Sequence, residues 1–448
     1  MDEGKSPSFG SLHSKESSDE KYRRELVRIR KSSSFRIGTH FIRSIEQPWR
    51  FPLLLFSFPW LLMSIVLERL GRKSHPVDGT KSVQSGDLRK SIVMFPTNGV
   101  GFGHFTRMLA LARRVRKLDP EIEIIFFTTM PTLHLLKREG FAAYHIPGRK
   151  KFDNMDAATW NMLTEEMLAN VFTIHRPSLF IFDGAFPYRG MLNAIQNDTG
   201  MKKIWMRRGT FRKGGTKIPV DSINHFQFII NPKDSVSETY DDGDVMDFKP
   251  AIIRSDPIIF LDEIELRPRN DLRDRLGIPH DAVVVYLQLG AGQINDIQSD
   301  ISTCLKTLEQ YENAYVVLGE SLIGSRIPSI GGRVRIISEY PNSLDFRAFD
   351  FTIMAAGYNS YHEAIRFSLP TLCIPNMNTG MDDQLARAEV AEKAGAMIVL
   401  REVSEDKVAV AIDRLMDPEV RRLMIERCES LHQPNGANQL AKWLVNVI

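Results

Sequence analysis

Residues 351–384 hold the side chains whose types and spacing are best suited to chemistry. The apolar run Phe351–Ala355 is followed by Gly357, Asn359 and Ser360, and Glu363 comes three residues later. This order is typical of a buried strand, a glycine turn and a helix start, where outward-pointing backbone amides favour an anion. Asn359 and Ser360 could hold a pyrophosphate there, and Glu363 could accept hydrogen bonds from ribose hydroxyls. The spacing of Ser360 and Glu363 also fits a capping box, which needs no ligand.

A second strand and loop follow directly along the chain. The run Pro370–Pro375 predicts the strand, and Asp382, Asp383 and Gln384 stand before the next helix. An acid and an amide at this place are suited to hydrogen bonds with sugar hydroxyls. Either aspartate could instead simply cap the helix.

His104 is the candidate catalytic residue. It follows Gly101 and Gly103 at the end of the first predicted strand and precedes Thr106 and an amphipathic helix. Imidazole titrates near neutral pH and suits a general base, although a lone histidine is more often structural. The glycine spacing also resembles a dinucleotide fingerprint, but Phe126–Thr129 lacks the acidic residue that such a site requires at the end of its second strand.

Other strand ends carry further candidates. Gly290, Gly292 and Gln293 follow the strand Val283–Leu289, and they could donate backbone amides to phosphate or form a plain tight turn. Asp183 ends another predicted strand. The double arginine Arg207–Arg208 ends the next; such a pair is usually solvated, but it would bind an acceptor that carries phosphate.

Two series of short apolar runs alternate with amphipathic segments from Ser91 onward. The predicted strands are Ile92–Phe95, Ile122–Phe127, Leu179–Asp183, Lys203–Met206 and Phe226–Ile230, then Val283–Leu289, Ala314–Leu318, Val334–Ser338, Phe351–Ala355 and Thr371–Ile374. Continuous apolar runs are typical of parallel strands that are covered on both faces. We therefore expect an α/β protein with two doubly wound Rossmann-like domains facing a cleft. The expected domains are 91–255 on the acceptor side and 256–448 on the donor side, with the break near Ala251–Asp271. The last helix could return to the first domain.

Residues 1–90 differ in texture from the rest. Residues 1–35 are rich in Ser, Lys, Glu and Arg and are expected to be disordered. Phe51–Leu67 is 17 residues without a charge, at the short end of what spans a bilayer, and Pro59 interrupts it. Three interpretations stay open: a transmembrane anchor, a monotopic helix or hairpin on anionic lipid, and an arm packed on the protein's own surface. The polar segment Lys73–Leu88 is expected to be a linker.

Bulk composition excludes several classes of protein. The chain has 448 residues, of which 43% are hydrophobic and 25% charged, unlike a polytopic membrane protein or a wholly disordered chain. Net charge is +3, but residues 21–50 carry nine Lys/Arg against two Glu, so the remainder is net negative, unlike a nucleic-acid binder. The widely spaced cysteines, Cys304, Cys373 and Cys428, predict buried free thiols rather than a disulfide framework or a zinc site.

In this order the motifs resemble the donor-site block of GT-B glycosyltransferases, both UDP-glycosyltransferases and MurG-type or galactolipid-forming enzymes. The resemblance covers about Ser91–Ile448. It rests on Gly357-Tyr-Asn-Ser-x-x-Glu363, Leu369-Pro370, Pro375, Asp383-Gln384, the preceding Ser338-Glu-Tyr340, and Gly101-x-Gly103-His104.

The resemblance implies a role for each matched residue. Asn359 and Ser360 would contact the donor phosphates, and Glu363 the ribose. Asp383 and Gln384 would contact the transferred sugar. Apart from these roles, we expect Tyr340, Gly290, Gly292 and Gln293 on the donor side, and Gly101, Gly103, Thr106, Asp183, Arg207 and Arg208 on the acceptor side.

One position departs from the family pattern. Many UDP-glycosyltransferases carry a histidine two residues before the motif glycine, where this chain has Ala355. The phosphate contact must then come from Gly290–Gln293 or from a basic residue.

The expected reaction is an inverting transfer of a hexose or N-acetylhexosamine from a UDP-sugar. His104 would take the proton from the acceptor hydroxyl or orient the acceptor. No cofactor or metal is expected, because the helix start stabilises the departing UDP and no Asp-x-Asp motif ends a strand. The expected partners are a UDP-sugar, a lipid-linked or glycan acceptor and an anionic membrane surface, but no nucleic acid.

The expected location is the cytoplasm, peripheral or monotopic at the inner face of the cell membrane, where both substrates are within reach. Two other functions stay open. A sugar-nucleotide 2-epimerase would need no acceptor, and a non-catalytic nucleotide-sugar sensor would tolerate the loss of His104.

Overall fold

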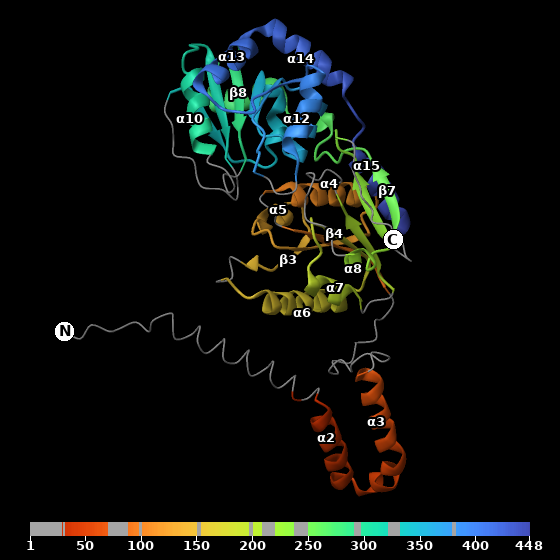
Figure 1. Cartoon of the computed structure of the whole chain (residues 1–448). Coiled ribbons are helices and arrows are strands. Elements are labelled where there is room, and N and C mark those ends of the chain that lie inside the picture. The colour runs from red at the N-terminus through yellow and green to blue at the C-terminus, as the bar shows by residue number, and fades with distance from the viewer. Residues whose placement is uncertain are drawn as a thin grey trace, which may run out of the picture. The chain divides into compact units, whose positions relative to one another are not determined.

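The computed structural model describes residues 29, 32–69, 88–97, 101–149, 154–196, 200–207, 220–236, 250–290, 297–320, 332–378 and 382–448. Of the predicted site residues, Gly292, Gln293 and Arg208 lie outside these ranges, as does nearly all of the predicted linker. The chain divides into two compact units, Met1–Ser85 and Gly86–Ile448 (Figure 1).

The larger unit contains two parallel sheets. The first has the strand order β3-β2-β1-β4-β5-β6-β7. Its strands are β1 (Arg89–Pro96), β2 (Glu123–Thr128), β3 (Ala142–His145), β4 (Pro177–Asp183), β5 (Lys202–Met206), β6 (Phe228–Pro232) and β7 (Ala251–Ser255). The second has the order β10-β9-β8-β11-β12-β13. Its strands are β8 (Val283–Gln288), β9 (Ala314–Gly319), β10 (Val334–Ile337), β11 (Phe351–Met354), β12 (Thr371–Cys373) and β13 (Met397–Val399).

Helices cover both faces of each sheet, which confirms the predicted pair of doubly wound domains (Figure 1). The helices of the first half are α4 (Gly103–Leu118), α5 (Leu133–Arg138), α6 (Ala157–His175), α7 (Arg189–Gln196) and α8 (Val220–Ile223). Those of the second are α9 (Arg269–Leu276), α10 (Ile297–Leu308), α11 (Tyr358–Arg366), α12 (Gln384–Lys393), α13 (Glu405–Met416), α14 (Pro418–Ser430) and α15 (Gly436–Val447), with short 3-10 turns η3 (Glu263–Glu265) and η4 (Asn342–Ala348).

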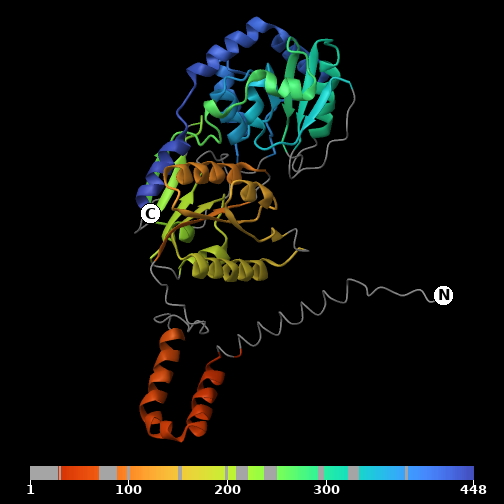
Figure 2. The ribbon, with the colours of Figure 1, turned by 180° about the vertical axis from the view of Figure 1, so that it is seen from behind.

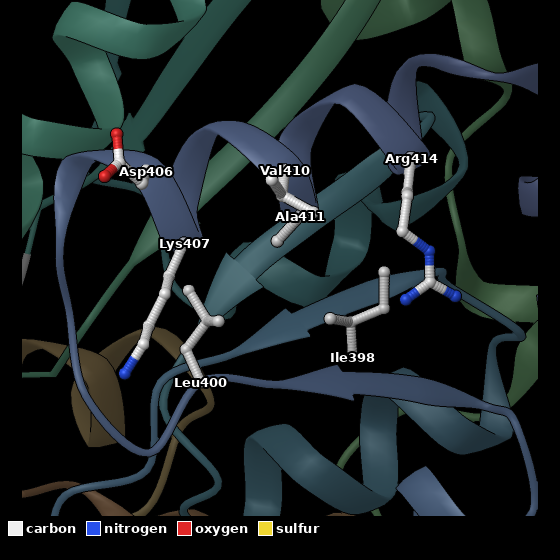
Figure 3. A pocket seen from close by; sticks show the side chains of 7 residues that line it. All are labelled: Ile398, Leu400, Asp406, Lys407, Val410, Ala411 and Arg414. Atoms are coloured by element: carbon white, nitrogen blue, oxygen red, sulfur yellow. The ribbon is translucent and has the colours of Figure 1, made fainter.

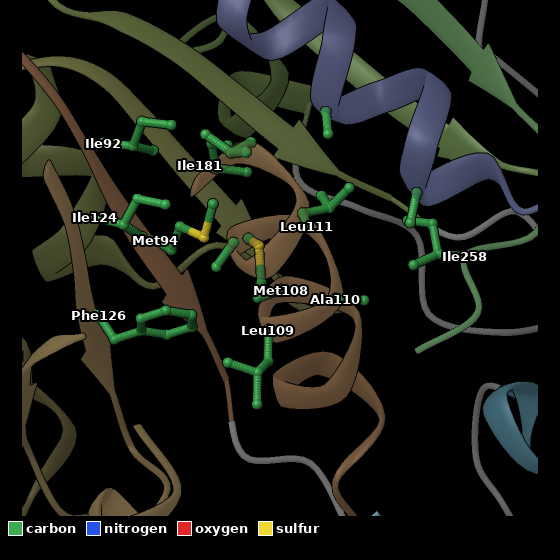
Figure 4. Packing of buried hydrophobic residues seen from close by; sticks show 14 of the residues in the cluster. Ile92, Met94, Met108, Leu109, Ala110, Leu111, Ile124, Phe126, Ile181 and Ile258 are labelled. Carbon is green, nitrogen blue, oxygen red and sulfur yellow. The ribbon is translucent and has the colours of Figure 1, made fainter. Parts of the chain in front are cut away.

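Successive side chains of β1 point to opposite faces of the sheet, so this strand contributes to two hydrophobic clusters. Ile92 and Met94 point into the cluster beneath α4, and Val93 and Phe95 point into the cluster beneath α6 and α7. Figure 4 shows α4 lying on the first of these clusters. The apolar spacing along α4 thereby fixes the helix that carries His104.

The last helix, α15, packs against α4 rather than against the second sheet. Its residues Ala437, Leu440, Ala441 and Leu444 are buried in the same cluster as α4. This burial ties the end of the chain to the first sheet.

Three strands were not predicted. β3 and β13 are short, and β7 is an edge strand that lies inside the segment where we placed the domain break. Because Ala251–Ser255 pairs with β6, the first sheet continues to Ser255. The cysteines Cys304, Cys373 and Cys428 are free and buried, as predicted.

The smaller unit is a helical hairpin, visible from both sides in Figures 1 and 2. It consists of α2 (Ser33–Glu46), the turn η1 (Pro48–Leu53) and α3 (Leu54–Arg69), so Ser33–Phe35 are helical although we expected disorder there. The segment Pro48–Glu68 is long and apolar enough to cross a membrane by length and composition alone.

Candidate functional site

Four of the predicted site residues, His104, Asp183, Gly290 and Gly357, lie where the strand order reverses. In the first sheet this point is between β1 and β4, and in the second it is between β8 and β11. Doubly wound sheets bind ligands at the carboxyl ends of the strands at such points. His104 and Asp183 follow β1 and end β4, and Gly290 and Gly357 follow β8 and β11.

His104 and Asp183 form a short polar contact in this region. Nδ1 of His104, in the first turn of α4, lies 2.6 Å from Oδ1 of Asp183. The pairing of β1 with β4 makes this possible, because Pro96 and Asp183 are register partners at the two strand ends. The side chain of His104 is 21% exposed, whereas that of Asp183 is 1% exposed.

Arg107 completes the contact from one turn further along α4. Its Nε and Nη2 donate to the two carboxylate oxygens of Asp183 at 3.1 and 2.8 Å. Burial alone would raise the pKa of Asp183, but Arg107 and His104 hold that pKa below its usual value. The carboxylate is therefore ionised. Nδ1 of His104 lies 2.6 Å from it and 2.9 Å from Nη2 of Arg107; in the tautomer that donates from Nδ1 to the carboxylate, Nε2 is the basic nitrogen.

Helix α11 begins directly after Gly357, and no described side chain caps its first turn. Since Ser360 is the third residue of the helix rather than its N-cap, the capping-box interpretation is wrong. A Cβ placed on Gly357 would meet nothing within 4 Å, so the approach to this helix start is open. Backbone amides at such an end lack intrahelical acceptors.

Asn359 lies beside the loop that carries His104. Its Nδ2 donates to the carbonyl of Gly103 at 3.4 Å, and its Oδ1 is buried with no hydrogen-bond partner among the described residues. An unpartnered buried acceptor is costly and suggests that a ligand group or water satisfies it. An amide oxygen accepts and does not donate, so this atom suits a hydroxyl rather than a phosphate oxygen.

Glu363 is buried in the second turn of α11. Its Oε1 accepts a hydrogen bond from the hydroxyl of Ser343 at 3.1 Å. Burial raises the pKa of Glu363 to about 7, and the serine opposes this shift only in part. A carboxyl group with this pKa changes its charge near neutral pH.

The acidic residues before α12 are engaged in structural contacts. Asp383 is the N-cap and accepts from the amide of Ala386 at 3.0 Å, which confirms the capping alternative for this residue. Gln384 accepts from the amide of Asn376 through Oε1 at 3.0 Å. Asp382 binds Nη2 of Arg387 at 2.7 Å. Any contact of Asp383 with a sugar must therefore coexist with its capping bond.

Thr106 and Tyr340, two of the remaining predicted residues, connect the two halves of the larger unit. The hydroxyls of Thr106 and Tyr340 lie 2.8 Å apart, so these residues, expected on opposite sides of the site, contact each other. Tyr340 also packs against Phe102 and Phe260. Its buried hydroxyl is accordingly part of the contact between the two halves.

The glycines differ in what they permit. Gly290 has φ +105°, which a side chain rarely adopts, and a Cβ on Gly101 would meet open space. At Gly103 an added Cβ would lie 3.7 Å from Nη1 of Arg107. Arg207 follows Met206, the register partner of Asp183, and its guanidinium lies over the ring of Trp205.

Comparisons with known proteins agree with this geometry. No model of a known protein family matches the chain. It is 24% identical over 192 residues to an uncharacterized glycosyltransferase of Methanopyrus kandleri, covering 42% of this chain and 54% of that protein. It is 24% identical over 326 residues to the UDP-N-acetylglucosamine–N-acetylmuramyl-(pentapeptide) pyrophosphoryl-undecaprenol N-acetylglucosamine transferase of Acetivibrio thermocellus, covering 67% of this chain and 82% of that enzyme.

Solved structures decide the fold. The glycotransferase of kitacinnamycin matches with a TM-score of 0.56 and 15% identity, covering 80% of this chain and 99% of its own. MurG of Acinetobacter baumannii matches with a TM-score of 0.51 and 13% identity over the same shares. The chain has the GT-B fold. Both sequence relatives are named as sugar-transferring enzymes.

The GT-B fold also brings together residues that the sequence did not single out. Arg387 on α12 binds both carboxylate oxygens of Asp234, after β6, at 2.9 and 2.7 Å, and both side chains are fully buried. The ring of Tyr358 lies between two cations, 5.4 Å from the guanidinium of Arg107 and 5.8 Å from that of Arg387. These contacts connect the helix start at α11 with the His104–Asp183 pair.

Spacing could have suggested two of these residues. Arg107 and Arg387 each stand three residues after a predicted site residue, His104 and Gln384, on the same helix face. Nothing in the local pattern marks Asp234.

A pocket lies elsewhere in the second half of the GT-B fold (Figure 3). It has a volume of about 330 Å³ and is lined by side chains of β13, α13 and the segment between them. None of the predicted site residues lines it. Four of its seven lining side chains are aliphatic, and the other three are Asp406, Lys407 and Arg414.

Proposed function

We propose that this protein is an inverting glycosyltransferase that moves a hexose or N-acetylhexosamine from a UDP-sugar to a membrane-associated lipid or glycan. The sequence relatives and the GT-B fold support glycosyl transfer as the class of reaction. The UDP donor, the stereochemistry and the acceptor belong to the proposal.

The His104–Asp183 pair carries the proposal, because it lies next to an open helix start. The Gly103 carbonyl, one residue before His104, accepts from Asn359 at 3.4 Å on α11. The start of α4, which carries the proposed base His104, is therefore in direct contact with the start of α11, which can bind an anion. This is the arrangement that a transfer between a hydroxyl and a diphosphate leaving group requires.

His104 acts as the base in the proposed step. Nε2 takes the proton of the acceptor hydroxyl while the oxygen of that hydroxyl bonds to the anomeric carbon of the donor sugar. The bond from that carbon to the diphosphate oxygen breaks, and UDP leaves with the electron pair, so the configuration inverts. Ionised Asp183 stabilises the imidazolium that forms.

The start of α11 receives the departing diphosphate. The hydroxyl of Ser360 and the amides of the first turn donate to the phosphate oxygens. They supply the phosphate contact that a histidine would make at the position where this chain has Ala355. Oδ1 of Asn359 accepts from a sugar hydroxyl, and Glu363 from the ribose. Asp383 and Gln384 contact the transferred sugar beside their structural bonds. No metal or cofactor is required for this step.

A panel of UDP- and GDP-sugars tests the donor. We expect a UDP-sugar to raise the thermal midpoint and a GDP-sugar to leave it unchanged, because a ligand of the native state stabilises by mass action. Release of UDP must then depend on an added lipid or glycan acceptor. Isomerisation of the UDP-sugar without acceptor would establish an epimerase instead, and binding without any turnover would establish a sensor.

A further inference from the structure

The hairpin α2–α3 pairs polar side chains between its helices and exposes large apolar side chains on its outside. Its helices are antiparallel, because Arg36 contacts Glu68 and His40 contacts Ser57. In soluble helical hairpins the apolar stripes face each other and the polar faces meet water. Here the seam between the helices holds polar pairs beside the aromatic contact of Phe41 with Phe58, whose ring centroids lie 5.0 Å apart.

The polar seam consists of paired groups. Arg36 donates to both carboxylate oxygens of Glu68 at 2.6 and 3.2 Å, and the hydroxyl of Ser64 donates to the same carboxylate at 3.1 Å. Nε2 of His40 lies 3.0 Å from the hydroxyl of Ser57. The side chain of Glu68 is 2% exposed, so the hairpin hides its acidic group inside.

The outer surface of the hairpin is apolar. More than half of the exposed large apolar side chains among the described residues lie between Phe35 and Val66. On α3, Leu55 and Phe56 are each 79% exposed, and Trp60 is 69% exposed. A contiguous apolar surface of this kind marks a membrane or partner interface.

The positive charge of residues 21–50 favours an anionic lipid membrane as the partner of this apolar surface. Residues 21–50 carry nine Lys/Arg against two Glu, which complements anionic headgroups. Trp49 and Trp60 are exposed, and tryptophan prefers the membrane interface. The guanidinium of Arg50 stacks on Trp49 at 4.9 Å in the turn, where a deep position would be costly.

Helix length and direction decide the mode of attachment. α2 has 14 residues, which gives about 21 Å at the usual rise, less than the ~30 Å hydrocarbon core. The apolar segment Pro48–Glu68 has the length to cross by itself, but α3 is paired side by side with the shorter α2. An antiparallel hairpin also returns the chain to the side from which it entered. We infer that the hairpin is a monotopic anchor that lies in one leaflet of an anionic membrane, with the exposed face of α3 in the acyl region.

Flotation of the full chain with vesicles tests this inference, which deepens the proposed membrane-associated acceptor. With vesicles of phosphatidylcholine and 30% phosphatidylglycerol, the wild type should float. The triple variant Leu55→Asn, Phe56→Asn, Met63→Asn should partition at least tenfold less, because it loses the membrane burial of large apolar side chains that are 79%, 79% and 60% exposed in the hairpin. The matched control Ile174→Asn, Ile264→Asn, Val410→Asn, exposed in the larger unit, should float like the wild type.

The depth of α3 in the bilayer distinguishes a monotopic from a membrane-spanning hairpin. A fluorophore on Leu55→Cys should be quenched most by lipids brominated near the headgroup end of the acyl chain, since the native cysteines are buried. Quenching strongest at the bilayer centre would overturn the monotopic mode. A wild type that stays with the soluble fraction, or a dimer that only the α3 variant dissolves, would overturn the lipid assignment. UDP-sugar binding, followed by thermal shift in the same samples, reports separately on the proposed function.

Discussion

Oδ1 of Asp183 lies 2.6 Å from Nδ1 of His104 and accepts a hydrogen bond from Nη2 of Arg107 at 2.8 Å. The three side chains come from the carboxyl end of β4 and the first turns of α4. Asp183 therefore has two tasks: it orients the imidazole, and it neutralises a buried guanidinium.

Asp183→Asn separates these tasks. Turnover should fall by about 10²–10⁴, because the amide no longer stabilises the imidazolium or fixes its tautomer. Stability should fall by about 3–5 kcal/mol, since Arg107 is left buried without a counter-charge. The double variant with Arg107→Met should regain stability but not turnover. Recovery of turnover in the double variant would contradict the role of Asp183 in orienting His104.

Arg387→Met should lower the free energy of unfolding by about 3–5 kcal/mol, because it removes the guanidinium that pairs with the buried carboxylate of Asp234. Adding Asp234→Asn should restore part of that loss in a double-mutant cycle followed by thermal unfolding. The control is Arg422→Met, whose guanidinium forms exposed pairs with Glu419 and Glu426. A control as damaging as Arg387→Met would show that the buried pair has no special weight.

Glu363→Gln should change stability in a pH-dependent way. Burial raises the folded-state pKa to about 7 from the ordinary 4.5, so the folded chain binds the proton more tightly than the unfolded chain. The wild type therefore loses stability as pH rises between these values, by on the order of 3 kcal/mol in full above pH 7. The variant lacks this loss, so its thermal midpoint should exceed that of the wild type more at pH 8 than at pH 5. Equal differences at both pH values would contradict the burial of an ionisable carboxyl; the exposed Glu312→Gln serves as the control.

Asn359 distinguishes a hydroxyl contact from a phosphate contact. Asn359→Ala should weaken UDP-sugar binding about tenfold, as expected for one lost hydrogen bond. Asn359→Asp should weaken it more, because a carboxylate would then stand close to the diphosphate. Titration calorimetry with a UDP-sugar and with UDP alone measures both. A variant that loses affinity for UDP as strongly as for UDP-sugar would assign Asn359 to the phosphates.

The sequence predicted ten of the thirteen described strands, because parallel strands covered on both faces are continuous apolar runs such as 92–95 and 283–289. It missed β3 and β13, which are too short for a clear period, and β7, whose edge position leaves most of its side chains exposed. Asp183 and His104 could be placed at one sheet edge from strand order alone.

The contacts between the halves could not be predicted. Asp234 and Arg387 are 153 residues apart in sequence, and no local pattern pairs them. The polar seam of the hairpin was equally hidden, because Glu68 marks the end of an apolar run in the sequence and shows no sign of its partner 32 residues earlier.

The rate of sugar transfer by His104→Ala, measured in a single turnover at saturating UDP-sugar with the donor dissociation constant taken in parallel, tests the central claim most directly. Loss of the base should lower that rate by about 10²–10⁴ while the dissociation constant stays within about twofold of the wild type. An unchanged rate would contradict the assignment of His104 as the base, and so would a loss of donor affinity equal to the loss of rate.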